Sequence, residues 1–293
     1  SYNYQKTAFG GDTNITEITF TKGTGEGYSY ESYSGYTPWY NSKANTIKVI
    51  IGEGIESIGK DMFIECTGLT TLILPSTIKT IKDSAFYKCS NIESEIDLSN
   101  ITSIGTSAFY NCQKMKGNWN LSTELTEIPN QAFYNCSARR GDINLENITL
   151  IGESAFYNCS NLTGTIKINN VEMLYNWTFY QCTSIEKVEL GGKVKTLEGA
   201  VFLKCSNLKE VIVGEGVTKL DGPVFAGCIG ITKLEIPISL DSVGYNSKYN
   251  YGEYNYQITA FGEDTNITEI IFTKGTGEGY SYESYSNYTP WCN

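Results

Sequence analysis

The chain has 293 residues, of which 40% are apolar and 18% charged, a composition typical of soluble folded proteins, with no run of about 18 apolar residues that could cross a bilayer. Its net charge of -10 at pH 7 argues against nucleic-acid binding, which needs clustered Lys and Arg, because only Arg139 and Arg140 are neighbours here. Histidine is absent, which removes the usual general base and the commonest metal ligand and excludes Ser-His-Asp hydrolase triads.

The first 43 residues form a segment that is rich in Tyr, Ser and Gly. Because the chain starts at Ser1 without Met or a signal peptide, we expect that any targeting segment has been cut away. Tyr offers a binding loop a rigid apolar ring and a hydroxyl at little entropic cost. The candidate ligand-binding residues of this segment are Tyr28, Tyr30, Tyr33, Tyr36 and Trp39. Alternatively, these rings fold back over the protein and shield it.

A repeat of 23 residues fills the chain from 44 to 240. Its anchor is a Phe followed three residues later by Cys, and the interval between anchors is 23 except for one of 24. The anchors are Phe63, Phe86, Phe109, Phe133, Phe156, Phe179, Phe202 and Phe225. Each unit is therefore predicted to be one coil of a solenoid with fixed inward positions. An alternating stretch after each Cys predicts a short β-strand, and the phrase around Phe predicts a single helical turn.

The repeated Phe and Cys are predicted to be buried columns and not a chemical site, because stacked coils place like residues ~5 Å apart. Zinc sites need ligands a few residues apart, whereas no two cysteines here are closer than 23 residues. Disulfides need Cβ atoms about 3.5 to 4.5 Å apart, closer than the rungs of such a column. We therefore expect free buried thiols, with Cys292, outside the series, as the candidate for an exposed reactive thiol.

In the coils led by Phe86, Phe109, Phe133 and Phe156, the inward pair of the strand falls one place later than elsewhere. Such a shift reverses the two faces of a strand unless a bulge absorbs it, so we expect an altered bend. The outward positions then form a polar strip of Glu95, Asp97, Asn118, Asn120, Asp142 and Asn144. On a concave solenoid face this strip would accept a basic protein surface, sugar hydroxyls or calcium. The alternative is an ordinary solvated strand face.

Residues 241–293 hold a second Tyr-rich insert and a second copy of the first segment. Residues 254–292 repeat residues 2–40 with 34 of 39 positions identical, and each copy is called the cassette below. The second cassette adds the candidate ligand-binding residues Tyr280, Tyr282, Tyr285, Tyr288 and Trp291. Recurrence after 252 residues predicts one period of a longer array, with end-to-end continuation into further cassettes and a gain in avidity.

Each cassette also fits the repeat. Phe9 and Phe261 take the Phe place, and Tyr40, 23 residues before Phe63, is predicted to take the next one. The interval from Phe9 to Tyr40 is eight residues longer than a regular coil, so the excess must leave the stack as a loop. Residues 1–293 are thus predicted to form a single solenoid: a divergent coil at 1–43, regular repeats at 44–240, and an insert with the second cassette at 241–293.

The regular unit resembles the repeat of the BspA-like leucine-rich-repeat family, which comprises bacterial surface proteins and some from protists. The likeness spans residues 44–240 and is carried in the first unit by Ile55, Ile58, Gly59, Phe63, Cys66, Leu69, Leu72, Leu74 and Pro75. It implies an α/β solenoid: a right-handed leucine-rich-repeat coil stack, mainly short parallel β-strands with short helical turns. It also implies a cell-surface or secreted location and adhesion to host proteins or other cells.

The sequence therefore predicts a non-enzymatic surface module, without cofactor or metal, that binds an extracellular protein or glycan through its concave face and Tyr-rich loops. A passive structural spacer in a repetitive surface protein is the alternative. An enzyme ranks third, because the paired carboxylates Glu95 and Asp97 lie on one strand without evident pocket walls. Neither nucleic-acid binding nor membrane insertion by this segment is expected.

Overall fold

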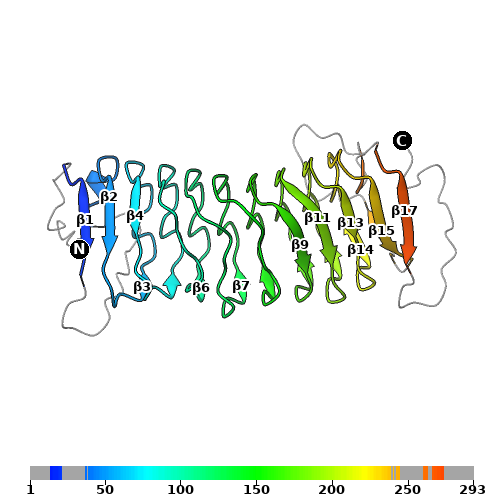
Figure 1. The fold of residues 1–293 in the computed structure, drawn as a ribbon, viewed down its shortest axis with the longest axis horizontal. Helices are drawn as coiled ribbons and strands as arrows, with labels where there is room; N and C mark the ends of the chain where they lie inside the picture. The colour runs from blue at the N-terminus through cyan, green and yellow to red at the C-terminus, as the bar shows by residue number, and fades with distance from the viewer. Residues whose placement is uncertain are drawn as a thin grey trace, which may run out of the picture. The chain divides into compact units, whose positions relative to one another are not determined.

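The computed structural model describes residues 14–21, 37, 39–238, 240, 242–244, 260–262 and 266–273. The chain divides into two compact units. Unit 1 comprises Ser1–Leu125 and Gln131–Arg140, and unit 2 comprises Thr126–Asn130 and Gly141–Asn293. Each unit is a stack of coils whose strands run parallel from one coil to the next (Figure 1).

Unit 1 contains two three-stranded parallel sheets, in the orders β1-β2-β4 and β3-β5-β6. The first sheet consists of β1 (Glu17–Phe20), β2 (Lys48–Ile51) and β4 (Thr71–Ile73). The second consists of β3 (Ser57–Ile58), β5 (Thr80–Ile81) and β6 (Ser103–Ile104). The second row of strands lies at the Ile-x-x-Ile part of each repeat, which the sequence marked as inward but not as a strand.

Unit 2 contains parallel sheets of five, four and two strands. The five-stranded sheet, in the order β17-β15-β13-β11-β9, consists of β9 (Gly164–Ile168), β11 (Ile185–Leu190), β13 (Glu210–Ile212), β15 (Lys233–Pro237) and β17 (Glu269–Thr273). The four-stranded sheet consists of β10 (Met173–Leu174), β12 (Thr196–Leu197), β14 (Lys219–Asp221) and β16 (Ser242–Gly244). The two-stranded sheet pairs β7 (Glu127–Ile128) with β8 (Leu150–Ile151).

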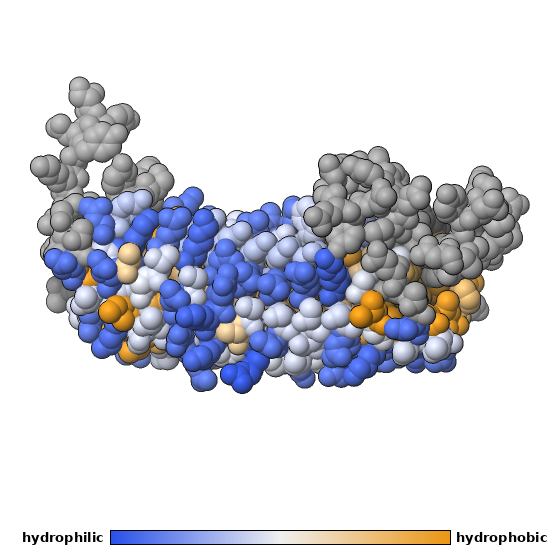
Figure 2. Space-filling view, turned by 90° about the horizontal axis from the view of Figure 1, so that it is seen from above, coloured by the Kyte–Doolittle hydropathy of each residue, from blue (hydrophilic) through white to orange (hydrophobic). Residues whose placement is uncertain are grey.

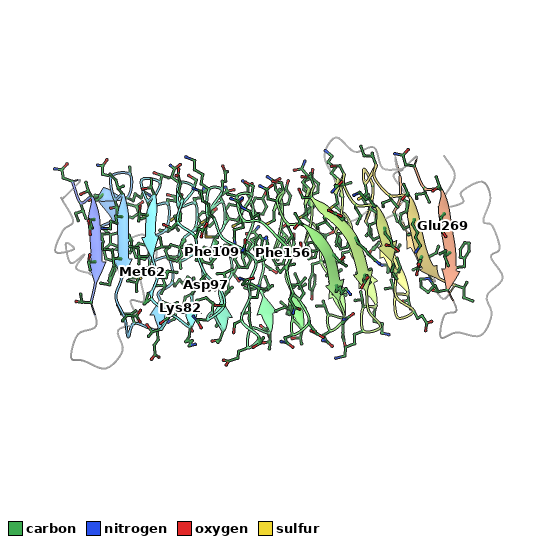
Figure 3. All side chains as sticks on the ribbon, in the orientation of Figure 1. Met62, Lys82, Asp97, Phe109, Phe156 and Glu269 are labelled. Carbon is green, nitrogen blue, oxygen red and sulfur yellow. The ribbon has the colours of Figure 1, made fainter. Side chains whose placement is uncertain are left out.

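Phe rings form a column in the core of each unit, as the sequence predicts. In unit 1 the rings run from Phe63 to Phe133 with centroids 5.3–5.6 Å apart, and in unit 2 from Phe156 to Phe261 at 5.2–5.3 Å. Phe109 and Phe156 mark the two columns in Figure 3. Each fully buried Phe contributes about 1.5 to 3 kcal/mol of hydrophobic free energy, so the columns supply much of the stabilisation.

The cysteine column is confirmed as a row of free, buried thiols; the eight described cysteines are Cys66, Cys89, Cys112, Cys136, Cys159, Cys182, Cys205 and Cys228. The structure adds a hydrogen bond that the sequence does not reveal. The Cys89 thiol donates to the Phe63 carbonyl of the preceding coil at 2.9 Å, and Cys112 donates to Phe86 at 3.1 Å. The same bond recurs at Cys136, Cys182, Cys205 and Cys228. Cys292 lies outside the described residues.

The predicted helical turns are wrong. Within the described residues the helical structure is one short 3-10 helix, η1 (Tyr40–Ser42). Around each Phe from Phe63 to Phe202 the residues two before and two after it adopt left-handed backbone conformations, as at Ser84 (φ 51°) and Lys88 (φ 58°). A helix cannot pass through two such residues within five positions. The right-handed coil stays a prediction.

The amide groups of the Phe phrase explain why the left-handed turns are tolerated. Phe86 N–H donates to Ala108 O at 2.8 Å and Lys88 N–H to Tyr110 O at 2.6 Å, both in the next coil. Cys89 N–H instead closes a turn onto Phe86 O at 3.1 Å. A helix would keep all these bonds inside one segment. The alternation ties each turn to its neighbour, which offsets the cost of about 1 kcal/mol for a left-handed residue.

The shifted coils end at a register irregularity, and their inward pairs keep facing the core. The ladder between β9 and β11 changes register between Ile185 and Lys187. The inward residues Ile96, Leu98, Trp119, Ile143, Leu145, Ile166 and Ile168 are all buried, whereas Leu121 is half-buried. Three of these coils have a glycine with positive φ eight residues after Phe: Gly117 (117°), Gly141 (91°) and Gly164 (73°).

Both cassettes contribute coils, as predicted. The strand of the first cassette, β1, pairs with β2 with Ile18 opposite Val49, and the strand of the second, β17, pairs with β15. Phe261 is buried and stacks on Phe225 at 5.2 Å. Phe9 lies outside the described residues.

The predicted place of Tyr40 is wrong. Trp39 is the residue that enters the column and stacks on Phe63 at 5.6 Å, while Tyr40 is exposed. The indole N–H of Trp39 donates to Met62 O at 3.1 Å. The reason is local. The 3-10 helix η1 begins at Tyr40, where regular coils have a left-handed turn, so the residue that points into the core is Trp39 and not Tyr40.

Candidate binding surface

The candidate surface consists of the outward positions of the strands that follow each Cys, called the strand face here. In unit 1 its predicted members Glu95, Asp97, Asn118 and Asn120 are all exposed, and the buried Ile96 and Trp119 separate them as strand alternation requires. Isolated parallel bridges pair Glu95 with Lys116 and Asn118 with Arg140. Asp97 is labelled in Figure 3. Asp142 and Asn144 are exposed on the strand face of unit 2.

Three of the six strip residues are used by the fold itself. Both carboxylate oxygens of Asp97 accept hydrogen bonds from Ser99, one from its N–H at 3.0 Å and one from its hydroxyl at 2.8 Å. Asn144 Oδ1 accepts the Glu146 N–H at 2.8 Å in the same kind of turn. Asp142 accepts the Thr163 hydroxyl at 2.7 Å. Asp97 and Asn144 close turns and Asp142 joins two coils, so the hydrogen-bonding capacity of these side chains for a ligand is reduced.

Glu95, Asn118 and Asn120 differ from those three. Within the part of the chain that the structure describes, their side chains make no ion pair or hydrogen bond. Asn118 and Asn120 lie on one coil, and Glu95 lies on the preceding coil, where its bridge partner is Lys116. Unit 1 thus presents a carboxylate and two amides, all open to water, on one strand face.

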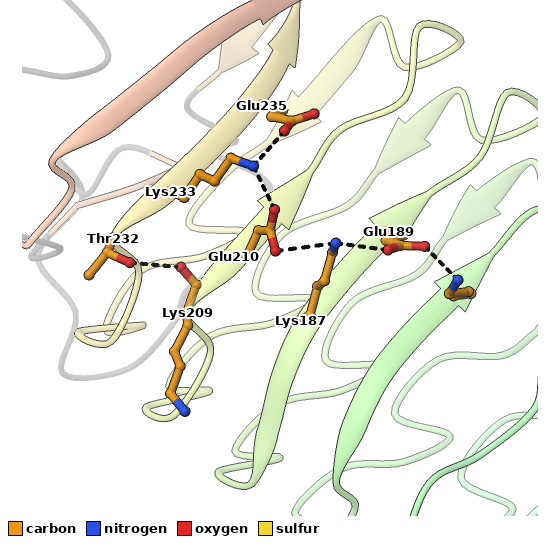
Figure 4. A network of polar contacts seen from close by, with 8 residues as sticks. Lys187, Glu189, Lys209, Glu210, Thr232, Lys233 and Glu235 are labelled. Carbon is orange, nitrogen blue, oxygen red and sulfur yellow. Dashed lines mark hydrogen bonds and ion pairs between the residues drawn. The ribbon is translucent and has the colours of Figure 1, made fainter.

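The strand face of unit 2 carries a different pattern, a continuous ladder of ion pairs (Figure 4). Its members alternate in charge from β9 to β15: Lys167, Glu189, Lys187, Glu210, Lys233 and Glu235. Nitrogen–oxygen distances along the ladder are 2.9–3.2 Å. We did not predict this ladder, although Lys and Glu at successive outward positions were its visible signal.

The ladder shifts the pKa values of Glu210 and Lys233. The Lys233 ammonium lowers the pKa of the Glu210 carboxyl through a hydrogen bond, and Lys187 adds to the effect. Hydrogen bonds to Glu235 and Glu210 raise the pKa of Lys233. Glu210 and Lys233 therefore stay charged around neutral pH, and the pairing of opposite charges along the ladder leaves little net charge to attract a partner.

Arg139 is the polar residue that sequence reasoning missed. It occupies the place that Leu, Ile or Met fills in other coils and is fully buried. Its guanidinium donates to the carbonyls of Ile96 at 2.8 Å, Lys116 at 3.2 Å and Asn118. It also lies 5.1 Å from the Trp119 ring. Arg139 therefore fastens the backbone that presents the strip in unit 1.

A second aromatic ladder lies on the turns, one residue after each Phe. Tyr87, Tyr110 and Tyr134 stack at 4.7 and 4.4 Å in unit 1, and Tyr157 stacks on Tyr180 at 4.6 Å in unit 2. Because each ring has at least one face covered by a neighbouring ring, the area that these tyrosines offer for stacking on a sugar is reduced.

Most of the predicted aromatic binding residues cannot be placed. Tyr28, Tyr30, Tyr33, Tyr36, Tyr280, Tyr282, Tyr285, Tyr288 and Trp291 lie outside the described residues. Trp39 is described, and its ring is buried against Phe63 and Phe20. Trp39 is therefore a core residue, which corrects its assignment to a binding loop.

Figure 2 shows hydrophilic side chains over much of the surface of both units. Among the described residues, no three His, Cys, Asp or Glu side chains gather as metal ligands. No helix in the described part of the chain has the length and apolarity needed to cross a membrane.

Coils of 23 residues with parallel strands and stacked inward columns define a solenoid repeat protein. The BspA type leucine rich repeat region matches residues 35–163 and 126–254, with six copies of the repeat. The chain belongs to the BspA type leucine-rich-repeat family. Leucine-rich-repeat proteins are generally binding or scaffold modules and not enzymes.

Several solved structures are similar to this chain. A leucine-rich cell surface protein from Faecalibacterium prausnitzii is 18% identical, with 81% of this chain and 78% of that chain covered and a TM-score of 0.45. The pneumococcal vaccine antigen PcpA is 17% identical, with 79% and 74% covered and a TM-score of 0.41. A leucine-rich-repeat protein from T. pallidum is 20% identical, with 74% and 78% covered and a TM-score of 0.36. No curated protein matches the chain.

Proposed function

We propose that the chain is a non-enzymatic adhesion module at the cell surface or in a secreted protein, which binds an extracellular protein or glycan. The observation that carries this proposal is the open polar strand face of Glu95, Asn118 and Asn120 in unit 1. A carboxylate and amides offer both hydrogen-bond acceptors and donors, which suit sugar hydroxyls or the basic and amide groups of a protein. The Tyr-rich loops are proposed as the second part of the binding surface.

The experiment is a binding screen of the full chain on an array of glycans and extracellular-matrix proteins, followed by variants. The strip variant combines Glu95→Ala, Asn118→Ala and Asn120→Ala. Its matched control combines Thr71→Ala and Thr165→Ala, which change the same outward position in coils outside the strip. The strip residues are exposed and the two control threonines are half-buried, and substitutions at such surface positions alter stability by about 0.5 kcal/mol each, so both variants stay folded.

The strip variant is expected to lose binding about ten-fold or more, roughly 1.4 kcal/mol, while the control binds like the unaltered chain. A loop variant with Tyr28, Tyr30, Tyr33 and Tyr36 changed to Ser tests the second part of the surface in the same assay. Absence of any partner, or equal loss in the strip variant and its control, contradicts the proposal.

A passive structural spacer is the second candidate, and the ion-pair ladder of unit 2 favours it. A strand face whose charges satisfy one another is suited to staying in solvent without a partner. The spacer predicts no signal on the array and no effect of the strip or loop substitutions on any interaction.

A further inference from the structure

The strand at the end of unit 2, β17, presents apolar side chains that are not covered. Ile270 and Phe272 occupy the inward positions of this strand, opposite Leu234 and Ile236 of β15, yet they are 37% and 52% exposed. β17 is the edge strand of its sheet. Hydrophobic (orange) residues also gather toward this end of unit 2 in Figure 2. The described inward residues of the preceding strands β9, β11, β13 and β15 are buried, and among the described residues no coil covers the outer edge of β17.

The first cassette shows which strand can cover the open side of β17. Its strand β1 has almost the sequence of β17, with Glu-Ile-Thr-Phe at 17–20 and Glu-Ile-Ile-Phe at 269–272. In unit 1 its other side is covered by β2, with Phe20 opposite Ile51. The ring of Phe20 also packs edge-on against Phe63 at 5.8 Å. The two copies thus display the two flanks of one coil, β15 on one side and β2 on the other.

We propose that β17 is a junction and that the coil which covers it has the sequence of residues 42–63 in a following period of this repeat. In that arrangement β17 takes the role of β1, and Ile270 and Phe272 meet the equivalents of Val49 and Ile51. The cassette is then one coil shared by two periods. The junction is independent of what the strand face of unit 1 binds.

The charge of Glu269 favours a β2-type strand as the neighbour of β17 over the β1 strand of a complete second copy added end to end. Glu269 lies opposite Lys233 on the β15 side. Its equivalent Glu17 lies opposite Lys48, with Glu17 Oε1 and Lys48 Nζ 3.2 Å apart. A β2-type neighbour therefore places a second Lys beside Glu269 and prolongs the Lys/Glu pattern of this sheet. A complete copy would bring its own β1, whose Glu17 would face Glu269, and like charges directly opposite repel.

Backbone groups fit the same neighbour. Thr16 O accepts the N–H groups of Ile47 and Lys48 at 2.8 and 3.1 Å in unit 1, and Thr268 is its equivalent beside β17. Glu269 N–H donates toward β15, to Thr232 O at 3.1 Å. Since successive residues of a parallel strand direct their amides to alternate sides, the N–H of Ile270 points to the open edge.

The test uses a two-period chain, residues 1–293 followed by residues 42–293, because Asn293 is the equivalent of Asn41. Hydrogen exchange is measured at the Ile270 amide, with the amide of buried Val211 as the internal reference. We expect the Ile270 amide of the first period to exchange about ten-fold or more slowly in the two-period chain than the Ile270 amide of the single chain. In the second period Lys48→Glu should reverse part of this protection, and the matched Lys48→Gln should reverse less.

Three outcomes would overturn the junction. One is equal exchange of Ile270 in both chains with an unchanged reference. Another is a two-period chain whose second period does not fold. The junction requires β17 of the first period to be the first neighbour of β2 in the second period, so that period should fold against it. The last is end-to-end association of intact single chains through β17, detected by sedimentation and abolished by Ile270→Asp, which would make a complete copy the occupant.

Discussion

The thiols show how one side chain can serve both packing and hydrogen bonding. Each Cys is a small apolar filler in its column, yet Cys89 and Cys112 also donate to carbonyls of the preceding coil. The spacing predicts burial because the period places like over like. It cannot predict the bond, since the acceptor is the carbonyl of the Phe 26 residues earlier and becomes a neighbour only after stacking.

Burial also makes the protein sensitive to alkaline pH. Desolvation raises the pKa of the Cys136 thiol to about 12, although the nearby Arg139 lowers it, whereas an unfolded Cys has a pKa of ~8.5. Below pH ~8.5 both states keep the proton, and above it only the unfolded chain releases the proton. The Cys136 thiol alone should therefore lower the free energy of unfolding by up to about 1.4 kcal/mol per pH unit between pH ~8.5 and about 12.

Urea unfolding at several values between pH ~8 and ~10.5 measures this dependence. Cys136→Ala removes one thiol and should give a shallower dependence than the unaltered chain. Identical slopes for the two proteins would contradict the assignment of a raised pKa to Cys136.

Arg139 takes the place of an apolar inward residue and donates hydrogen bonds to carbonyls of the two preceding coils. Its donors reach Ile96, 43 residues earlier, and also Lys116, so one side chain joins three consecutive coils. In the sequence, Arg139 stands at a repeat position that other coils fill with Leu, Ile or Met. This departure from the repeat pattern could have identified it.

Arg139→Leu should lower the free energy of unfolding by about 2 to 4 kcal/mol, although Leu is the usual residue at this position. The loss arises because three buried carbonyls lose their donor. Arg140→Leu, at the exposed neighbour, is the matched control and should change stability by no more than about 0.5 kcal/mol. Urea unfolding of both variants measures these changes. Equal stability of the two variants would contradict the stabilising role of the Arg139 hydrogen bonds.

At the scale of elements, the strands were predictable and the turns were not. Alternation after each Cys marks β4, β11 and β13 because strand side chains repeat with period 2. The Phe phrase has the apolar spacing of a helical turn, but Ser84 and Lys88 are left-handed and every second amide bonds to the next coil. Such bonds depend on a neighbouring coil, so local spacing within one unit cannot reveal them.

Glycine is required where the shifted strands begin. At Gly117, with φ 117°, an added Cβ would lie 2.9 Å from Ile96 O and 3.1 Å from Arg139 Nη1. Gly117→Ala should therefore destabilise by about 1 to 3 kcal/mol. The control Gly192→Ala, where nothing lies within 4 Å, should be close to neutral. Equal shifts of the urea midpoint in both variants would show that the bulge tolerates a side chain.

For the whole molecule, the period of 23 residues predicts stacked coils, the columns and the family, because these depend on residue types that recur. It also predicts the exposed strip, since alternation fixes which side of a strand faces solvent. It does not predict that Asp97 and Asn144 close turns or that Trp39 replaces Tyr40 in the column. Those outcomes depend on single local geometries that occur once or twice in the chain.

The alternation of amide bonds around each Phe has a consequence for how such genes change length. Every regular turn offers its successor the same donors and acceptors that it received from its predecessor. Excision or duplication of one 23-residue block therefore rejoins surfaces of the same kind and leaves no orphaned polar group. Unequal recombination between similar repeats of the gene can then lengthen or shorten the protein by whole coils, and most of the products remain able to fold.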